Sequence, residues 1–147
     1  MANREDPLIG FHFAVEIQGV VTGYFTECSG LGSENEIIEH KVVSENGQEI
    51  ILKIPGRLHW GDIVLKRGIT SSMDIWDWHK QIEDGDINNP RHDGSVVMYD
   101  QELKEVARWN FERAWPIKVT GPQPKADSNA IGIEELTLTH EYITRVK

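Results

Sequence analysis

The stretch LKRGITSSMDIWDWH, residues Leu65 to His79, contains the end of a predicted strand and the start of the one convincing helix. Upstream, residues Gly61 to Arg67 interleave aliphatic side chains with charged ones, as a half-buried strand does. The hydroxyls that precede the helix, those of Thr70, Ser71 and Ser72, are candidate N-caps. Asp74 lies three residues after Ser71, which makes an imperfect capping box and places a carboxylate at the positive helix end.

Helical spacing continues downstream of this start. Ile75, Trp78, His79 and Ile82 share one helix face, and Gly85 supplies a stop. Since the rest of the chain reads as strand, one helix of about three turns must cover a largely β structure. The predicted fold is therefore mainly β, a small barrel or sandwich of antiparallel strands with one α-helix packed on it.

Length and charge limit the possible classes of function. A chain of 147 residues predicts one domain, residues 1–147, that can bury most of its apolar surface. The net charge of −9 should repel a phosphate backbone, so a basic nucleic-acid-binding face is not expected. Cys28 is the single cysteine, which excludes an internal disulfide and predicts an inert thiol.

The sequence shows no apolar run of the ~20 residues that a membrane span needs, and no hydrophobic signal core. We therefore expect synthesis and assembly in the cytoplasm, without membrane insertion by the monomer. Residues 1–9 are polar and contain Pro7, which predicts a flexible N-terminal arm.

The first half of the chain alternates in a strand-like way. Residues Phe11 to Ile17 have period two, and Tyr24 to Cys28 reads as the returning half of a hairpin. From Asn35 to Glu45 apolar side chains point to both faces, so either the helix or a neighbouring subunit must bury one set. Asn46-Gly47 is a strong hairpin signal, Gln48 to Ile54 is the predicted return strand, and Pro55-Gly56 is its predicted end.

The second half reads as a loop followed by long strands. Asp84, Asp86 and Asn88 have the first spacings of a calcium loop within Glu83 to Ser95. However, Asn89 stands where the turn needs Gly and Ser95 where a bidentate Glu belongs, so a solvated loop is predicted. Further strands are predicted over Val96 to Tyr99, Glu105 to Ala114 with Trp115-Pro116 as its end, and Ile133 to Val146. On the last strand Leu136, Leu138, Tyr142 and Val146 are expected opposite Thr137, Thr139 and Glu141.

The motifs of common enzymes are missing from this sequence. There is no Walker-type loop, nucleophile elbow, paired Cys-x-x-Cys or His-Glu-x-x-His, and the six histidines are scattered over different segments. We therefore predict no catalytic residues, no cofactor and no metal. The five tryptophans are interpreted as core residues. Two other readings stay open, a soluble carbohydrate- or ligand-binding β-barrel and a hydrolase whose site is assembled in space.

Three ordered blocks carry a family resemblance. They are Pro55-Gly56-Arg57 with Gly61 to Thr70, Ala107 to Lys118 with Gly121-Pro122, and Ile133 to Glu141. Together they resemble the tail tube protein family of contractile phages and phage-like injection systems. The resemblance implies the fold of the type VI secretion tube protein, hexameric rings stacked into a hollow inner tube, and no enzymatic activity. Implied partners are the sheath protein, the baseplate or tube-initiator and spike proteins, a terminator cap, and protein effectors or DNA as cargo in the lumen.

Assembly residues follow from the resemblance and from the two-faced strand. The hairpin over residues 42–51 is predicted to reach an adjacent subunit or ring, and the N-terminal arm is a second contact between rings. The predicted assembly interface comprises Asn3, Asp6, Ile37, Ile38, Val42, Val43, Asn46, Gly47 and Gln48. The polar strand face of Thr137, Thr139 and Glu141 is the predicted lumen wall. A tube-initiator paralogue at the baseplate is an alternative to the main tube subunit.

Overall fold

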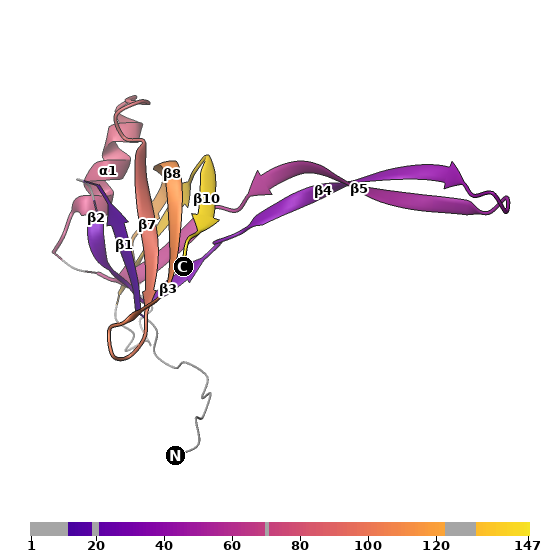
Figure 1. The fold of residues 1–147 in the computed structure, drawn as a ribbon. Coiled ribbons are helices and arrows are strands. Elements are labelled where there is room, and N and C mark those ends of the chain that lie inside the picture. The colour runs from indigo at the N-terminus through magenta and orange to yellow at the C-terminus, as the bar shows by residue number, and fades with distance from the viewer. Residues whose placement is uncertain (1–11, 19–20, 70, 123–131) are drawn as a thin grey trace, which may run out of the picture.

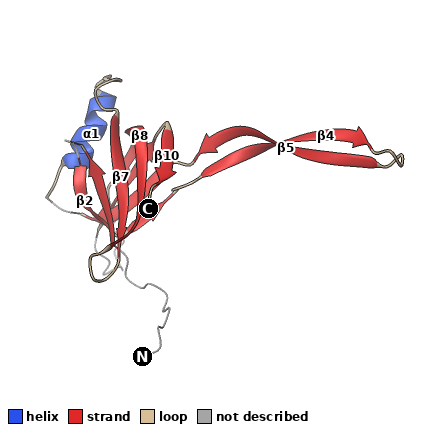
Figure 2. Cartoon of the chain, viewed as in Figure 1, coloured by secondary structure: helices blue, strands red, loops and turns tan. Residues whose placement is uncertain are grey.

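The computed structural model describes residues 12–18, 21–69, 71–122 and 132–147. This part of the chain forms ten strands and one helix (Figure 1; Figure 2). In chain order the elements are β1 (His12–Ile17), β2 (Val21–Phe25), β3 (Glu27–Ser29), β4 (Ser33–Val43), β5 (Glu49–Trp60), β6 (Ile63–Gly68), α1 (Asp74–Glu83), β7 (His92–Tyr99), β8 (Glu105–Thr120), β9 (Ile133–Thr139) and β10 (Tyr142–Arg145).

Eight strands form one antiparallel sheet, which is the body of the molecule. Seven of them follow the order β2-β1-β7-β8-β9-β6-β3, and β10 pairs with β8 beside this path. The strands at its two ends, β2 and β3, are consecutive in the chain and are separated only by Thr26, whose N–H donates to the Lys66 carbonyl at 2.8 Å. The sheet therefore curls back on itself. The prediction of a mainly β, antiparallel fold with one helix is confirmed.

The core lies inside this curled sheet and under the helix. On β1, Val15 and Ile17 are fully buried while His12 and Glu16 are exposed, as the period-two pattern predicts, although Ala14 on the other face is buried as well. The other large buried apolar side chains are Phe25, Ile63, Leu65, Ile75, Trp78, Val96, Val97, Phe111, Leu136, Leu138 and Ile143. The hairpin β4–β5 is a separate two-stranded sheet, and among the described residues it takes part in this core only through Trp60 at its base, so the core is built almost entirely by the body.

Helix α1 packs on the body through Ile75 and Trp78, and the Trp78 indole N–H donates to the Pro90 carbonyl at 2.6 Å. The N-cap is Met73, so the prediction of a Ser71 or Ser72 N-cap is wrong, and Thr70 lies outside the described residues. The Asp74 carboxylate instead accepts the N–H of Ile75 at 2.8 Å, which satisfies one free donor of the first turn. Gly85, with φ of +92°, follows the helix end as predicted.

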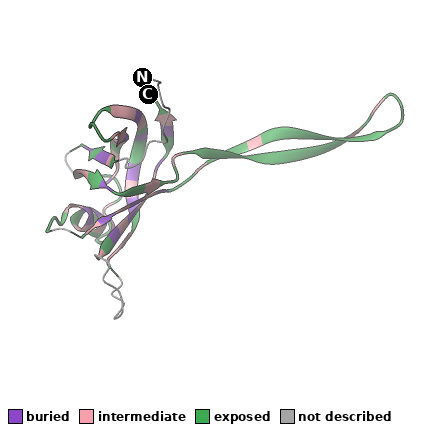
Figure 3. Cartoon of the chain, turned by 90° about the horizontal axis from the view of Figure 1, so that it is seen from below, coloured by how far each residue is buried: buried purple, intermediate pink, exposed green. Residues whose placement is uncertain are grey.

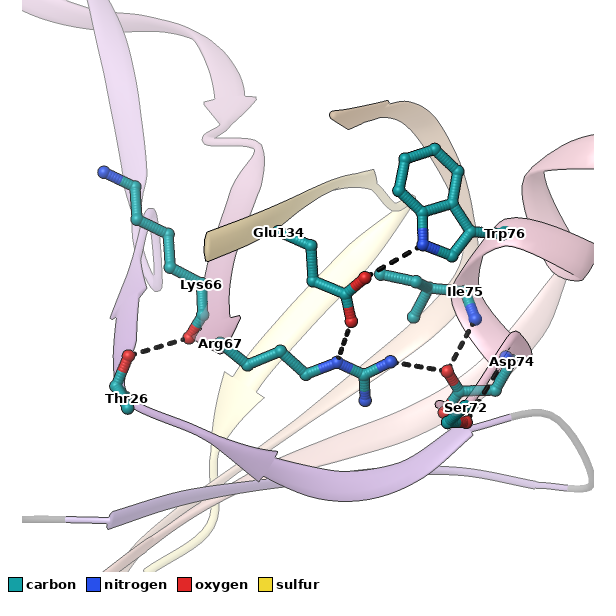
Figure 4. Close-up of polar contacts among 8 residues, drawn as sticks. All are labelled: Thr26, Lys66, Arg67, Ser72, Asp74, Ile75, Trp76 and Glu134. Atoms are coloured by element: carbon teal, nitrogen blue, oxygen red, sulfur yellow. Dashed lines mark hydrogen bonds and ion pairs between the residues drawn. The ribbon is translucent and has the colours of Figure 1, made fainter. Parts of the chain in front are cut away.

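A buried ion-pair network joins the helix to the sheet (Figure 4). Arg67 on β6 donates through Nε to Glu134 on β9 at 2.5 Å and through Nη2 to Asp74 at 2.6 Å, and the Trp76 indole N–H donates to the other Glu134 oxygen at 2.9 Å. Glu134 is only 1% exposed and Arg67 6%. Burial alone would raise the pKa of the Asp74 carboxyl, but the hydrogen bonds from Arg67 and from the Ile75 N–H hold it below its ordinary value.

Two predicted strand ends are wrong, for the same physical reason. Strand β5 continues through Pro55-Gly56 to Trp60, and β8 continues through Trp115-Pro116 to Thr120. Both prolines lie at register irregularities, one beside the shift between Asn35 and Ile37, the other at the shift between Pro116 and Lys118. A proline lacks the N–H that a ladder needs, and a bulge is where a sheet tolerates this loss.

The predicted terminal strand from Ile133 to Val146 is two strands, because the chain breaks between β9 and β10. The break reverses which side chains face the core: Leu136 and Leu138 are buried, whereas Tyr142 and Val146 are exposed and Ile143 is buried instead.

Two smaller boundaries also differ from the predictions. Cys28 belongs to β3 and pairs with β6, so the hairpin with β1 ends at Phe25. The loop predicted over Glu83 to Ser95 ends earlier, because His92 already begins β7.

Glu134→Gln should lower the free energy of unfolding by about 3 kcal/mol, because the buried positive charge of Arg67 loses one of its two carboxylate partners. The new side-chain NH2 would also face the N–H donor of Arg67 or of Trp76, with which it cannot form a hydrogen bond. Urea unfolding measures the change. Glu135→Gln is the matched control, since that neighbouring side chain is only half-buried. Equal losses in the two variants would contradict a structural role for the network.

Candidate assembly interface

The β4–β5 hairpin, residues Ser33 to Trp60, projects from the body as a long arm (Figure 1; Figure 3). At its tip the Ser44 N–H donates to the Gln48 carbonyl at 2.8 Å, and Gly47 adopts a φ of +76°. The hairpin turn therefore forms where Asn46-Gly47 predicts it. Nearly all side chains of the arm are exposed. An isolated two-stranded hairpin is marginally stable in water, so this arm needs a surface to lie on.

The arm has two chemically different faces. Register pairs Ile38 with Ile54 and Val42 with Ile50, and side chains alternate between faces along each strand. The Ile38 side chain also lies 3.0 Å from the place where Gly56 would carry a Cβ, which puts both positions on one face. We call the set on this side the apolar face, and it consists of Ile38, Val42, Ile50, Leu52 and Ile54.

Beyond Ile37 toward the tip, the charged residues of the two strands lie on the opposite face of the arm, whereas Glu36 nearer the root lies on the side of Ile38. Glu39 pairs in register with Lys53, and Lys41 lies 3.9 Å from the Glu49 carboxylate. Ile37, Val43 and Ile51 are interspersed on this side, so it is mixed rather than polar throughout. The arm is thus an amphipathic ribbon.

Exposure of the apolar face is unusual for a monomer. Ile38 is 53% exposed, Ile54 45% and Leu52 44%. Fully burying one such side chain is worth about 1.5 to 3 kcal/mol. A contiguous apolar surface of this kind marks an interaction site.

Glycines fix the root of the arm on the body. Gly30 has a φ of +85°, and a Cβ there would lie 1.8 Å from the Asp62 carbonyl oxygen. The Gly32 N–H donates to the Gly30 carbonyl at 2.9 Å, and the Gly61 N–H donates to the Gly32 carbonyl at 3.2 Å. The two strands of the arm therefore leave and re-enter the body side by side.

Aromatic side chains of the body also contact the root of the arm. The Trp60 ring meets the Tyr142 ring edge to face at 5.3 Å between centroids. The His140 side chain is buried and its Nε2 lies 3.0 Å from the Gly61 carbonyl, to which it donates. Burial lowers the pKa of His140 below its ordinary value, so the ring is neutral at pH 7.

The structure places most of the predicted assembly residues in the arm. Ile38 and Val42 lie on the apolar face, Ile37 and Val43 on the opposite face, and the remaining three, Asn46, Gly47 and Gln48, at the tip. Asn3 and Asp6 lie outside the described residues.

Sequence reasoning did not assign the apolar residues of β5 to this interface. Their signal is the period-two pattern of Ile50, Leu52 and Ile54. The strand itself continues through Pro55-Gly56 to Trp60, which extends the arm well beyond residues 42–51.

The residues predicted for a lumen wall do not share one strand. Thr137 and Thr139 lie on the face of β9 opposite the buried Leu136 and Leu138 and are half-buried. Glu141 follows the end of β9, is exposed, and forms an ion pair with Arg113 at 3.0 Å. The prediction that all three residues share one strand face is therefore wrong. That Thr137 and Thr139 face the lumen stays a prediction.

Other chemistry is sparse in the part of the chain that the structure describes. It contains no group of three or more His, Cys, Asp or Glu side chains that could hold a metal ion, at the acidic loop or elsewhere. Burial raises the pKa of Cys28 to about 12, which makes its thiol unreactive. Trp78 is buried, and Trp60, Trp76 and Trp109 pack against the core. No helix in these ranges has the length and apolar character to span a bilayer.

Comparisons with known proteins cover nearly the whole chain. Residues 10–144 match the family model described as T4-like virus tail tube protein gp19. No curated protein sequence matches significantly.

Solved structures with the same fold include the sheath-tube complex of an extracellular contractile injection system, PVC, in the extended state, with a TM-score of 0.75, 24% identity, and coverage of 97% of this chain and 93% of that chain. The structure of the tube terminating cap of the anti-feeding prophage has a TM-score of 0.74 and 22% sequence identity, with coverage of 99% of this chain and 93% of that chain. Hcp1 from Flavobacterium johnsoniae has a TM-score of 0.56 and 15% sequence identity, with coverage of 91% of this chain and 94% of that chain. The predicted similarity to the fold of secretion tube proteins is therefore confirmed.

Gly30→Ala should destabilise the protein by at least about 2 kcal/mol, because the new Cβ would collide with backbone and the residue must hold a positive φ. Urea unfolding reports the loss. Gly32→Ala is the control, since no atom lies within 4 Å of its added Cβ. If both variants unfold at the same urea concentration, Gly30 does not set the root.

Acidification should weaken the folded body through His140. The folded pKa lies below the ordinary value of about 6.5, so below that pH the unfolded chain takes up a proton that the folded chain refuses. The free energy of unfolding should therefore fall as the pH drops through 6.5 toward the folded pKa. Unfolding of the wild type and of His140→Gln at pH 7.5 and 5.5 tests this, and an equal pH dependence in both would contradict it.

Proposed function

The chain belongs to the T4-like virus tail tube protein family, and from this premise we propose that it is the structural subunit of the inner tube of a contractile injection system or phage tail. In this proposal the subunits form hexameric rings, and the rings stack into a hollow tube. The chain acts as a wall element of a conduit and has no enzymatic activity.

The arm is the observation that carries this proposal. A body with a closed core that exposes a second, separate apolar surface requires a partner for that surface. A copy of the same chain is the partner always available during assembly. If the arm of one subunit lies on the body of the next, the contact is heterologous, and repeated heterologous contacts close into a ring or continue as a helix.

Partners of the tube follow from the structural neighbours. A sheath-tube complex and a tube terminating cap contain chains of the same fold, which supports a sheath and a cap as partners here. Baseplate or initiator and spike proteins are further proposed partners. The N-terminal residues, with Asn3 and Asp6, are proposed as a second contact between rings. Assembly would take place in the cytoplasm, within the particle.

The lumen is proposed to be a passive surface. A net charge of −9 per chain would give no electrostatic attraction between the wall and DNA or acidic proteins, so such cargo would not adhere to it. Thr137 and Thr139 on the outer face of β9 are the proposed lumen residues. Protein effectors or DNA are the proposed cargo.

A tube-initiator or cap paralogue is the second candidate function, because a terminating cap is as similar to this chain as the tube of a sheath-tube complex. The two candidates differ in whether the chain assembles alone. A carbohydrate-binding barrel is less well supported, since Trp60, Trp76, Trp78 and Trp109 serve the core and the root of the arm.

Leu52→Glu should prevent ring and tube formation while leaving the body folded, because it places a charge in the middle of the apolar face. Negative-stain electron microscopy of the purified variant, with circular dichroism as a folding check, measures both effects.

Ile51→Glu is the matched control for this experiment, since the new carboxylate lies on the opposite face and in register with Lys41. Wild-type tubes from Leu52→Glu would contradict burial of the apolar face in the assembly. Folded wild-type protein that forms no rings at any concentration would favour the paralogue.

A further inference from the structure

One titratable residue interrupts the apolar face of the arm. His40 lies on β4 between Ile38 and Val42 at period two, and its register partner on β5 is Leu52. Alternation therefore turns the imidazole to the same side as the aliphatic side chains. The residue is exposed in the monomer.

The neighbours of His40 on this face are uncharged. Ile38 and Val42 flank it on its own strand, and Leu52 lies opposite, with Ile50 and Ile54 on the diagonals. The adjacent charged residues of the arm, Glu39, Lys41 and Lys53, alternate to the other face. On the face where His40 lies, the next carboxylate along β4 is that of Glu36, which stands beyond Ile38 and is held by His59.

A second histidine of the arm has the opposite surroundings. His59 lies near the root, and its Nε2 is 2.8 Å from the Glu36 carboxylate. A proton on that ring would be stabilised by its own chain. The arm therefore contains one histidine with a carboxylate partner and one surrounded by aliphatic side chains.

Covering the apolar face changes the cost of protonating His40. In the monomer, water solvates the imidazolium as well as the neutral ring. Under a partner surface the ion would lose this hydration, and no carboxylate of its own arm lies beside it, since Glu36 pairs with His59. The neutral ring can be covered at much lower cost.

We propose that His40 is a proton-sensitive element of the assembly interface, so that the arm docks on a second copy of this chain when the imidazole is neutral and is released when it is protonated. The inference rests on the proposed function, because it needs the apolar face to be buried between subunits. It adds a regulation by pH to that contact.

The critical concentration for assembly should rise about tenfold when the pH falls from 7.5 to 5.5, the range in which histidine side chains in general change their charge.

The experiment measures this critical concentration by sedimentation of the full chain at pH 7.5, 6.5 and 5.5. Wild type, His40→Leu and His59→Gln are compared. His40→Leu keeps an apolar side chain of similar size and should assemble equally well at all three values. His59→Gln removes the other histidine of the arm and should keep the tenfold rise. Tryptophan fluorescence at each pH restricts the comparison to folded protein, since His140 also responds to acid.

The results separate the inference from the proposed function. A tenfold rise in the wild type that His40→Leu abolishes supports the proton-sensitive element. The same rise in His40→Leu, or stronger wild-type assembly at pH 5.5, overturns it while leaving the tube subunit intact. Folded protein that stays monomeric at every pH and concentration overturns both.

Discussion

The architecture depends on an apolar surface that the chain cannot bury by itself. A two-stranded ribbon has only two faces and no second layer, so the apolar face, which includes Ile38, Leu52 and Ile54, stays in water for as long as the subunit is alone. The body has no such deficit, because its curled sheet and single helix close around one core. The body buries its apolar side chains by itself, whereas the arm can bury its apolar face only against another molecule. This difference favours assembly of the subunits.

The body serves the arm by fixing where it starts. Gly30 allows a backbone approach to Asp62 that no side chain could permit, and the aromatic contact of Trp60 with Tyr142 fixes the return strand. On the other side of the core, Arg67 and Glu134 tie the helix to two strands. Both sets of contacts restrict internal motion of the free subunit, which lowers the conformational entropy that must be lost when subunits join.

Sequence patterns predicted the parts of the fold that depend on local periodicity. The alternation on β1, the helix stripe of Ile75 and Trp78 and the Asn46-Gly47 turn all appear where expected. Errors arose where tertiary contacts override local rules, as at Pro55 and Pro116, which strands pass through at irregularities in register. The break at His140 was equally invisible, because the contact that His140 makes there is with Gly61, far away in the sequence.

The central claim is that another copy of the chain covers the apolar face of the arm. A cryo-electron microscopy reconstruction of the assembled protein tests it most directly. Our account predicts rings in which Ile38, Leu52 and Ile54 of each arm are buried against a neighbouring subunit. Rings or tubes that leave this face in solvent would contradict it.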